Sequence, residues 1–417
     1  MKILVLGSGL LGVTSAYALA KRGFDVTVID RKATSGAETS FANGGQLSYS
    51  HAEPWANPTV TRHLLKFILD PNSPLVLRPR ADRAMIKWGL QFLQNCSEKR
   101  ARVNCVNILR LGLYSREEMA TLRADTGIAF DFSARGILHV FGDDQSFDHA
   151  KHHNEFQARF GGDERVLTTE EVFALEPALA HTERTIIGGI HAHMDESGDA
   201  YMFCNALEAH IREKFGVKFL HGVTIQSMKT EGNRIAAVST DQGDMTADGF
   251  VMAMGSYSPL LLKPIGIDLP IYPMKGYSIT LPANEYCPNM SLTDGTFKIV
   301  YSRLGDRLRI AGTAEFAGHN DKVRERRITP IIKAARGLLP KADWNADISR
   351  WACLRPSTPD GPPIIGKTPY FNLFLNTGHG TLGWTQAAGS ATLLADIMEN
   401  KPPAIITAGL TLERYLS

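Results

Sequence analysis

Residues 1–30 have the sequence MKILVLGSGLLGVTSAYALAKRGFDVTVID, and this stretch decides the fold. An apolar run at residues 3–6 leads directly into Gly7-Ser8-Gly9-Leu10-Leu11-Gly12. A helical stretch follows as far as Lys21, and a second apolar run ends at Asp30. A strand, a glycine-rich turn, a helix and a second strand with a terminal acid are the order of a dinucleotide-binding βαβ unit. The sequence therefore predicts a dinucleotide site at the start of the chain.

The three glycines of this turn each have a physical role. Gly7 permits the tight turn, Gly9 lets the backbone approach a pyrophosphate, and Gly12 allows the helix to pack closely on the strand. The phosphates would lie at the helix N-terminus, where free N–H groups and the helix dipole favour negative charge. Asp30 is placed to accept hydrogen bonds from a ribose. The motif alone does not distinguish FAD from NAD.

The bulk composition is that of an ordinary globular protein. The chain has 417 residues, enough for two or three domains, with 44% hydrophobic and 21% charged residues. A net charge of +2 gives no argument for nucleic-acid binding. The five cysteines are scattered without a CxxC pair, which predicts reduced thiols in a cytoplasmic protein and no metal site. The N-terminal apolar stretch continues into the βαβ unit, so we do not expect a signal peptide, and no run reaches the about 18 apolar residues that span a bilayer.

Two segments after the βαβ unit leave alternatives open. Residues 38–48 contain Asn43-Gly44-Gly45-Gln46, whose hydrogen-bonding groups predict cofactor contact, against a plain surface loop as the alternative. Residues 50–80 are rich in proline and should form short helices and turns. Within them, the apolar clusters of residues 60–80 either pack on the body of the protein or lie on a membrane surface or partner. Helical periodicity continues at residues 83–95 and 104–126.

The second half of the chain alternates between two kinds of strand. Residues 250–258 form a buried apolar run that ends in glycine and small polar residues, as in a parallel strand returning to the dinucleotide sheet. Residues 269–313 alternate between apolar and polar, which predicts antiparallel strands of a second sheet that covers the substrate. Near the C-terminus, Asn376-Thr377-Gly378-His379-Gly380-Thr381-Leu382-Gly383-Trp384-Thr385 forms a second glycine-rich turn between a strand and a helix.

Several of these blocks together resemble one enzyme family. They include residues 40–46, 52–55, 252–258, Pro273-Met274-Lys275-Gly276-Tyr277-Ser278, Leu354-Arg355-Pro356-Ser357-Thr358-Pro359-Asp360-Gly361 and residues 376–385. Over nearly its whole length the chain resembles the FAD-dependent amino-acid oxidase superfamily of D-amino-acid oxidase, glycine oxidase and sarcosine oxidase. Within that superfamily it is most similar to the small subunits of bacterial D-amino-acid dehydrogenases. The last two motifs are distinctive when they occur together.

The resemblance implies an α/β fold in which a Rossmann-like FAD-binding domain carries an inserted mixed-sheet α+β substrate domain. The expected FAD-binding parts are residues 1–80, 186–262 and 346–417. The expected substrate-domain parts are the helical and strand insertion of residues 81–185 and the antiparallel sheet of residues 263–345.

The resemblance also implies an extended FAD, with its adenine end at the first glycine turn and its flavin ring between residues 43–46 and the second glycine turn. A helix N-terminus near Gly383 would stabilise the negative charge that develops on a reduced flavin, which favours a flavin over a nicotinamide. The residues expected to bind FAD are Leu6, Gly7, Ser8, Gly9, Leu10, Leu11, Gly12, Asp30, Arg31, Ser40, Asn43, Gly44, Gly45, Gln46, Gly255, Gly378, His379, Gly380, Thr381, Leu382, Gly383 and Thr385.

Oxidation of an amine at Cα requires a clamp for the substrate carboxylate. Arg355 occupies the family's substrate-arginine position and can bind a carboxylate bidentately; the alternative is a structural arginine paired with Asp360. Lys298 and Tyr301 are weaker candidates for the substrate wall, or else outward-facing strand residues. His379 is as suited to orienting its loop as to acting as a base. We expect direct hydride transfer from Cα to flavin N5 without an obligatory side-chain base.

The resulting hypothesis is an FAD-dependent dehydrogenase that converts D-alanine-like D-amino acids into 2-oxo acids and ammonia. Its expected partners are the D-amino acid and a quinone or another respiratory acceptor, without nucleic acid. We expect a cytoplasmic location, with peripheral contact with the inner face of the plasma membrane as a further hypothesis. The alternatives are an oxidase or dehydrogenase of a related amine such as D-hydroxyproline or glycine, a catalytically silent flavoprotein subunit, and an NAD-dependent dehydrogenase.

Overall fold

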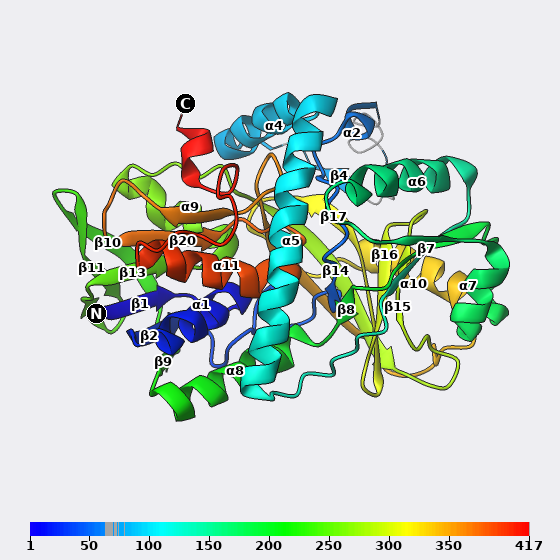
Figure 1. Ribbon diagram of the computed structural model, residues 1–417, viewed down its shortest axis with the longest axis horizontal. Helices are drawn as coiled ribbons and strands as arrows, with labels where there is room; N and C mark the ends of the chain where they lie inside the picture. Colours follow the sequence, from blue (N-terminus) through cyan, green and yellow to red (C-terminus); the bar gives the residue numbers. More distant parts are fainter. Residues whose placement is uncertain (63–69, 71–72, 74, 79, 417) are drawn as a thin grey trace.

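A computed structural model describes residues 1–62, 70, 73, 75–78 and 80–416. Two large sheets dominate the structure and lie at opposite ends of its long axis (Figure 1). The long helix α5, Glu98–Thr126, crosses the middle of the molecule in front of them. This arrangement confirms the predicted α/β class, with a Rossmann-like sheet and a second mixed sheet.

The first sheet has six strands in the order β19-β20-β13-β1-β2-β9. Strand β1 pairs in parallel with β2 and with β13, and only β19 pairs antiparallel, with β20. The continuous apolar run of β1, Lys2–Leu6, is typical of a strand in the middle of a parallel sheet, because such a strand is covered on both faces. Its strands are β1 (Lys2–Leu6), β2 (Asp25–Asp30), β9 (Lys218–His221), β13 (Gly249–Met252), β19 (Ile364–Lys367) and β20 (Leu373–Thr377).

Helices cover this sheet on one face and a small sheet covers the other. Helix α1 (Leu10–Lys21) packs against α11 (Gly383–Met398) and α8 (Ala200–Phe215), and α5 packs outside α11. Together they enclose a core that includes Val5, Val13 and Leu394. The opposite face is covered by α9 (Ser258–Leu262) and by the three-stranded sheet β10 (Ile225–Glu231), β11 (Arg234–Thr240) and β12 (Gly243–Met245).

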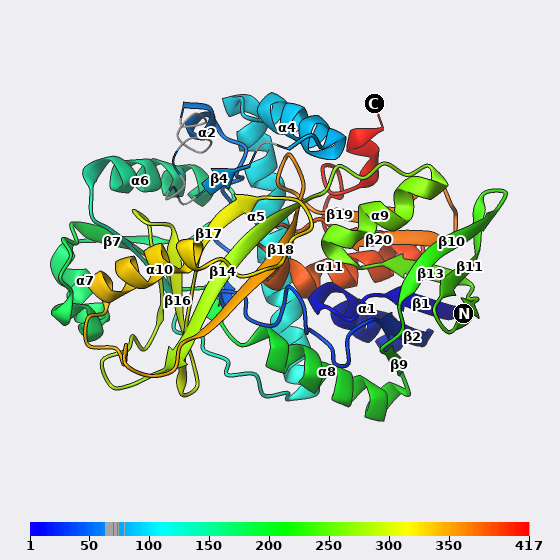
Figure 2. The same ribbon diagram turned by 180° about the vertical axis from the view of Figure 1, so that it is seen from behind.

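The second sheet has nine strands, eight of them in the order β18-β14-β17-β16-β15-β5-β7-β6, with β4 beside β17. Figure 2 shows its long strands β14 and β18 running side by side. Helix α10 (Glu325–Leu338) packs on one face over β14 and β17. Its strands are β4 (Leu75–Leu77), β5 (Ile137–Phe141), β6 (Arg165–Leu167), β7 (Gly188–Ala192), β14 (Tyr272–Pro282), β15 (Ser291–Asp294), β16 (Ile299–Leu304), β17 (Arg307–Phe316) and β18 (Ser349–Ser357).

Three strands do not follow the division expected from the sequence. Strands β4, β7 and β18 lie in the nine-stranded sheet, although their residues fall within the segments assigned to FAD binding. A strand joins the sheet that offers it a pairing edge, and local sequence does not reveal that edge. Residues 128–132 form no strand, and Asp131 among them has a φ of 53°, outside the extended conformation.

The remaining elements are short or peripheral. They are α2 (Pro58–Arg62), α4 (Arg83–Asn95), α6 (Asp144–Ala158), α7 (Thr169–Leu175), the pair β3 (Gln46–Leu47) and β8 (Glu196–Ser197), and the 3-10 turns Pro177–His181, Gly255–Tyr257, Lys263–Ile265 and Leu412–Tyr415. Much of the segment hypothesised to touch a membrane, residues 63–69, 71–72, 74 and 79, lies outside the described residues. Among the helices that the structure does describe, none has the length and apolar character to cross a bilayer.

Candidate active site

A cavity of about 1360 Å³ extends along the molecule from the first glycine turn to the nine-stranded sheet. Its lining comes from segments that are far apart in the sequence, including both glycine-rich turns, the loop of residues 42–46, and strands β14, β16, β17 and β18. The cavity begins at the carboxyl ends of β1 and β2, where open α/β sheets bind their ligands.

The first glycine turn has the geometry of a dinucleotide cradle. A Cβ added to Gly7, which has a φ of 104°, would lie 2.8 Å from the Ala253 carbonyl oxygen. A Cβ on Gly12 would lie 1.8 Å from the Gly7 oxygen, so both positions require glycine. The N-cap residue of α1, Gly9, has no side chain, and Ser40 Oγ accepts a hydrogen bond from the Leu10 N–H at 3.3 Å, so the helix dipole and the remaining amides of the first turn can face an anion. Asp30 Oδ2 accepts a hydrogen bond from the Ser8 N–H at 2.7 Å and retains further acceptor sites for a ribose.

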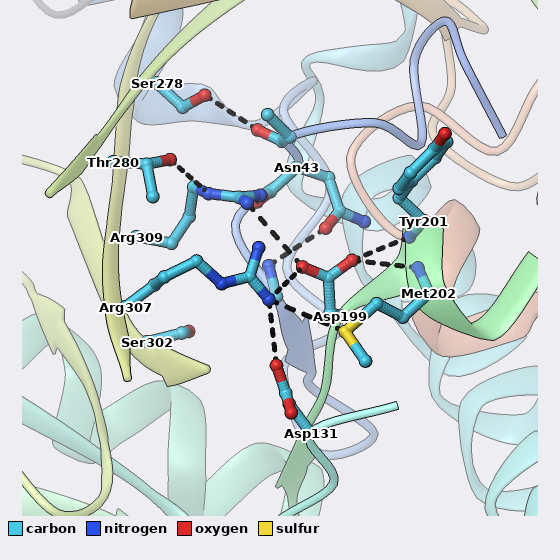
Figure 3. A network of polar contacts seen from close by, with 12 residues as sticks. Asn43, Asp131, Asp199, Tyr201, Met202, Ser278, Thr280, Ser302, Arg307 and Arg309 are labelled. Atoms are coloured by element: carbon cyan, nitrogen blue, oxygen red, sulfur yellow. Dashed lines mark hydrogen bonds and ion pairs between the residues drawn. The ribbon is translucent and has the colours of Figure 1, made fainter. Parts of the chain in front are cut away.

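The loop of residues 42–45 is held against the nine-stranded sheet by hydrogen bonds to its backbone. Ser278 Oγ donates to the Ala42 oxygen and Ser302 Oγ to the Gly44 oxygen, each at 2.7 Å. Arg309 donates to the Asn43 oxygen at 3.2 Å (Figure 3). A Cβ on Gly44 would meet Val300 at 2.8 Å, so the loop lies too close to the sheet for any other residue there. The sheet thus fixes the backbone that lines the cavity.

A buried charge network continues from this loop to helix α8. Arg309 is 4% exposed, and its Nε donates to Thr280 Oγ1 at 2.6 Å. Asp199 lies 3.7 Å from Arg309 and 3.1 Å from Arg307, and its other oxygen caps the first turn of α8 (Figure 3). Arg307 also contacts Asp131 at 2.8 Å. The network joins the two sheet systems at the cavity wall.

The second glycine turn is fixed by helix α11. His379 forms a 2.9 Å hydrogen bond through Nε2 with Ser390 Oγ on α11, and burial lowers the pKa of His379 to about 3. Thr385 Oγ1 accepts a hydrogen bond from the Ser48 N–H at 2.9 Å, which connects this turn to the end of the first loop. No side chain caps α11, so its N-terminus at Gly383 can stabilise negative charge. His379 therefore orients the turn as a neutral imidazole.

Arg355 lies on β18 with its guanidinium over Gly276 of the neighbouring strand. A Cβ on Gly276 would come within 2.5 Å of the Arg355 guanidinium carbon, so the missing side chain makes room for that group. Asp360 is engaged elsewhere, since Arg414 Nε donates to it at 2.7 Å and Tyr415 also contacts it. Among the described residues no carboxylate forms an ion pair with Arg355, and its side chain lines the cavity. A carboxylate-bearing ligand would supply the missing counter-charge.

Lys298 and Tyr301, the two weaker candidates for substrate contact, lie on opposite faces of the sheet near β16. Lys298, immediately before β16, lines the cavity. Tyr301 is absent from the lining and fully buried in the core beneath α10, because successive side chains of a strand point to opposite faces. The structure therefore removes Tyr301 from the cavity wall.

The other predicted contacts divide into lining and supporting residues. Those that line the cavity are Gly7, Gly9, Leu10, Leu11, Asp30, Arg31, Ser40, Asn43, Gly44, Gly45, Gln46, Gly255, His379, Gly380, Thr381, Leu382, Gly383 and Thr385. Leu6, Ser8, Gly12 and Gly378 do not line it. They belong to the turns behind its surface: Leu6, for example, packs in the apolar core. The contacts of all these residues with a cofactor remain predictions.

A polar wall at the other end of the cavity was not expected from the sequence. His51, Glu53, His139 and His149 come from separate segments and line the same space. His149 Nε2 donates to Glu53 Oε1 at 3.1 Å. Burial by itself raises the pKa of Glu53, but the hydrogen bond from His149 and the nearby histidine charges outweigh it and hold that pKa at about 2. The surrounding protein, which desolvates the His51 ring where it faces the cavity, lowers the pKa of His51 to about 4.

Sequence reasoning missed this wall and the Arg309 network because their members are distant in the chain. The residues brought together from β17, α8 and the loop of residues 42–45 are separated by more than 100 positions, such as Arg309 and Asn43. One local feature marks Asp199, since it directly precedes helix α8 and acidic residues are favoured N-caps. No pattern indicated that its second oxygen faces two arginines.

Comparisons with known proteins agree on one family. The family model described as FAD dependent oxidoreductase matches residues 2–397. A D-amino acid dehydrogenase of Paramagnetospirillum magneticum is 47% identical, covering 100% of this chain and 99% of the relative. One of Dechloromonas aromatica is 46% identical, covering 97% and 98%. The crystal structure of L-proline dehydrogenase from P. horikoshii superposes with a TM-score of 0.77 at 20% identity, covering 100% and 97%, and shares the fold.

Proposed function

The chain belongs to the FAD-dependent oxidoreductase family, and we propose that it oxidises D-amino acids to 2-oxo acids and ammonia as a dehydrogenase. The observation that carries the proposal is the cavity-lining Arg355, which lacks a carboxylate partner among the described residues. Two relatives of 46–47% identity over nearly the full length bear the name D-amino acid dehydrogenase.

The residues of the cavity fit FAD. The cradle at Gly7 and Gly12 excludes any side chain, and the glycine-capped N-terminus of α1 suits a pyrophosphate. The second helix terminus, at Gly383, opens onto the same cavity and suits the negative charge of a reduced ring system. When bound, FAD supplies the two-electron acceptor for oxidation of the substrate C–N bond.

Arg355 binds and orients the substrate in this proposal. Its planar guanidinium holds the α-carboxylate through two parallel hydrogen bonds, which fixes the position of Cα. Because Gly276 has no side chain, the Arg355 guanidinium can lie directly against strand β14. The substrate binds with its amine unprotonated and loses a hydride from Cα, and the resulting imino acid is hydrolysed by water. His379 takes no proton, because its Nε2 is bonded to Ser390 and its pKa is about 3.

Anaerobic mixing of the flavin-loaded protein with a panel of D- and L-amino acids tests this function. We expect D-amino acids to bleach the flavin absorbance and their L-enantiomers to leave it unchanged. Absence of bleaching by every D-amino acid would refute the proposal and favour a catalytically silent flavoprotein. A second measurement compares reduction of a quinone with peroxide formation in air; we expect electrons to leave through the quinone, and stoichiometric peroxide would indicate an oxidase instead.

A further inference from the structure

Lys298 occupies a strained position on the cavity wall. Strands β16 and β17 are antiparallel with Ile299 opposite Gly312, so Lys298 and Thr313 lie at the next opposing positions. Both have a φ of 56°, in the left-handed region that non-glycine residues rarely adopt. Both side chains line the cavity. Such strain persists where the surrounding structure enforces it, and it concentrates at functional sites.

The Lys298 ammonium has no counter-ion in the part of the chain that the structure describes. The acid whose pKa it affects, Asp143, accepts hydrogen bonds from the Ser146 N–H at 2.8 Å and from Thr296 Oγ1 at 3.1 Å. Glu53, on the same wall, is paired with His149 at 3.1 Å and also accepts from Asn57 at 3.1 Å. Both acids thus accept hydrogen bonds from other groups, and neither forms an ion pair with Lys298, whose exposed ammonium can bind a further anion.

Two further histidines at this end of the cavity, His51 and His139, are uncharged, whereas Glu53 carries a negative charge and is paired with His149. The rings of His51 and His139 stack with centroids 5.8 Å apart, and desolvation in the cavity wall lowers their pKa values to about 4 and 3, which keeps both neutral. The His51 ring forms no hydrogen bond with any described residue. Among the described residues no cluster of histidines, cysteines and acids is arranged to hold a metal ion, so these imidazoles are available to an organic ligand.

The spacing of the two cations suits a ligand with two anionic groups. The Arg355 guanidinium lies over Gly276 on β14, while Lys298 adjoins β16, two strands away across β17. Neighbouring strands are about 4.8 Å apart, so these two backbone positions are separated by about 10 Å, and the Lys298 side chain can shorten that gap. Two carboxylates joined by a short carbon chain can span it, each with its own cation.

We propose that the preferred substrate is an acidic D-amino acid of the D-glutamate type, with its α-carboxylate on Arg355 and its side-chain carboxylate on Lys298 and His51. The inference rests on the proposed oxidation of D-amino acids, and it specifies which side chain of the substrate the cavity prefers. Lys298 donates hydrogen bonds and cannot accept them, so it favours an anionic or carbonyl oxygen and leaves an apolar side chain without a partner.

Substrate comparison in a matched pair of variants tests the inference. We expect the flavin-loaded protein to have a higher kcat/KM for D-glutamate than for the neutral isostere D-glutamine or the apolar D-norvaline. Lys298→Met should lower kcat/KM for D-glutamate about ten- to hundredfold, as for loss of a hydrogen bond to a charged group, and change D-norvaline by less than about threefold. Lys229→Met, an exposed lysine on β10, is the control and should change neither.

Binding of unreactive acids gives a readout independent of turnover. Glutarate carries two carboxylates and butyrate one, and each can be titrated against the flavin absorbance spectrum. We expect glutarate to bind more tightly than butyrate, and Lys298→Met to abolish that difference.

Equal or higher kcat/KM for D-norvaline than for D-glutamate, or an unchanged substrate ratio in Lys298→Met, would overturn the inference and leave the proposed oxidation standing. A preference for D-arginine that disappears in Glu53→Gln would overturn it in favour of a cation-selective wall. If no D-amino acid reduces the flavin, both proposals fail together.

Discussion

The chemically most informative residue of the cavity is Arg355, which forms no ion pair with any carboxylate that the structure describes. The variant Arg355→Met keeps an unbranched apolar stem but lacks the guanidinium, so it cannot form the two proposed hydrogen bonds to the substrate carboxylate. We expect kcat/KM for the best D-amino acid to fall by about a hundredfold, since charge-assisted pairs are the strongest hydrogen bonds in proteins. Arg350→Met is the matched control, because Arg350 lies on the same strand with an exposed side chain paired to Glu325. Equal loss in both variants would contradict the clamp.

The glycine beneath the guanidinium offers a second test at the scale of one residue. In Gly276→Ala the new methyl group would lie 2.5 Å from the Arg355 guanidinium carbon and must displace it. We expect KM to rise at least about tenfold while the fold and flavin content are retained, because the clamp loses its position but not its charge. Gly89→Ala on α4, where nothing lies within 4 Å, should leave KM unchanged. An unchanged KM in Gly276→Ala would show that Arg355 does not hold the substrate.

At the scale of elements, the decisive contact is between the loop of residues 42–45 and the nine-stranded sheet. In Arg309→Met the Asn43 oxygen and Thr280 lose their donor, and Asp199 loses one of its two cations. Breaking a buried ionic contact costs about 3 kcal/mol, so the free energy of unfolding in urea should fall by that amount. The dissociation constant of the flavin should also rise, since the loop lines its cavity.

The control for this prediction is Arg165→Met. Arg165 forms an exposed ion pair with Glu171, and such pairs contribute little to stability. A matched loss of stability in both variants would mean that Arg309 has no special role in holding the loop.

Some secondary-structure elements could be predicted from the sequence, and others could not. The βαβ unit was predicted within a few residues because strand, glycine turn and helix are neighbours in the chain and each has a local physical cause. The pairing of strand β18 with β14 could not be predicted, because β14 lies more than 60 residues earlier in the chain. Lys298 was named as a candidate, but its left-handed backbone and its unpaired charge depend on β17, which only the three-dimensional structure reveals.

At the scale of the whole molecule, the pH dependence of stability reports on buried neutral histidine. His379 is 2% exposed and has a pKa of about 3, against the usual 6.5 of an unfolded chain. Between pH 6.5 and 3 the unfolded state therefore binds a proton that the native state does not, and stability falls as the pH falls. Replacing the residue in His379→Gln should flatten the plot of unfolding free energy against pH in this window by about 1.4 kcal/mol per pH unit.

Urea unfolding of the wild type and the variant at pH 7, 6, 5 and 4 measures this slope. His152→Gln serves as the control, because the His152 side chain is 79% exposed and its replacement should leave the slope as it is. A slope in His379→Gln identical to that of the wild type would show that His379 is protonated in the native state.

The strand order β19-β20-β13-β1-β2-β9 also governs when the enzyme can acquire its cofactor during synthesis. The phosphate turn beside β1 emerges from the ribosome first, whereas β20 and the turn at residues 378–383 that closes the same cavity are made almost last. A nascent chain that ends before β20 has the start of the cavity without its far wall. The cavity that fits FAD is therefore complete only after nearly the entire chain has been translated.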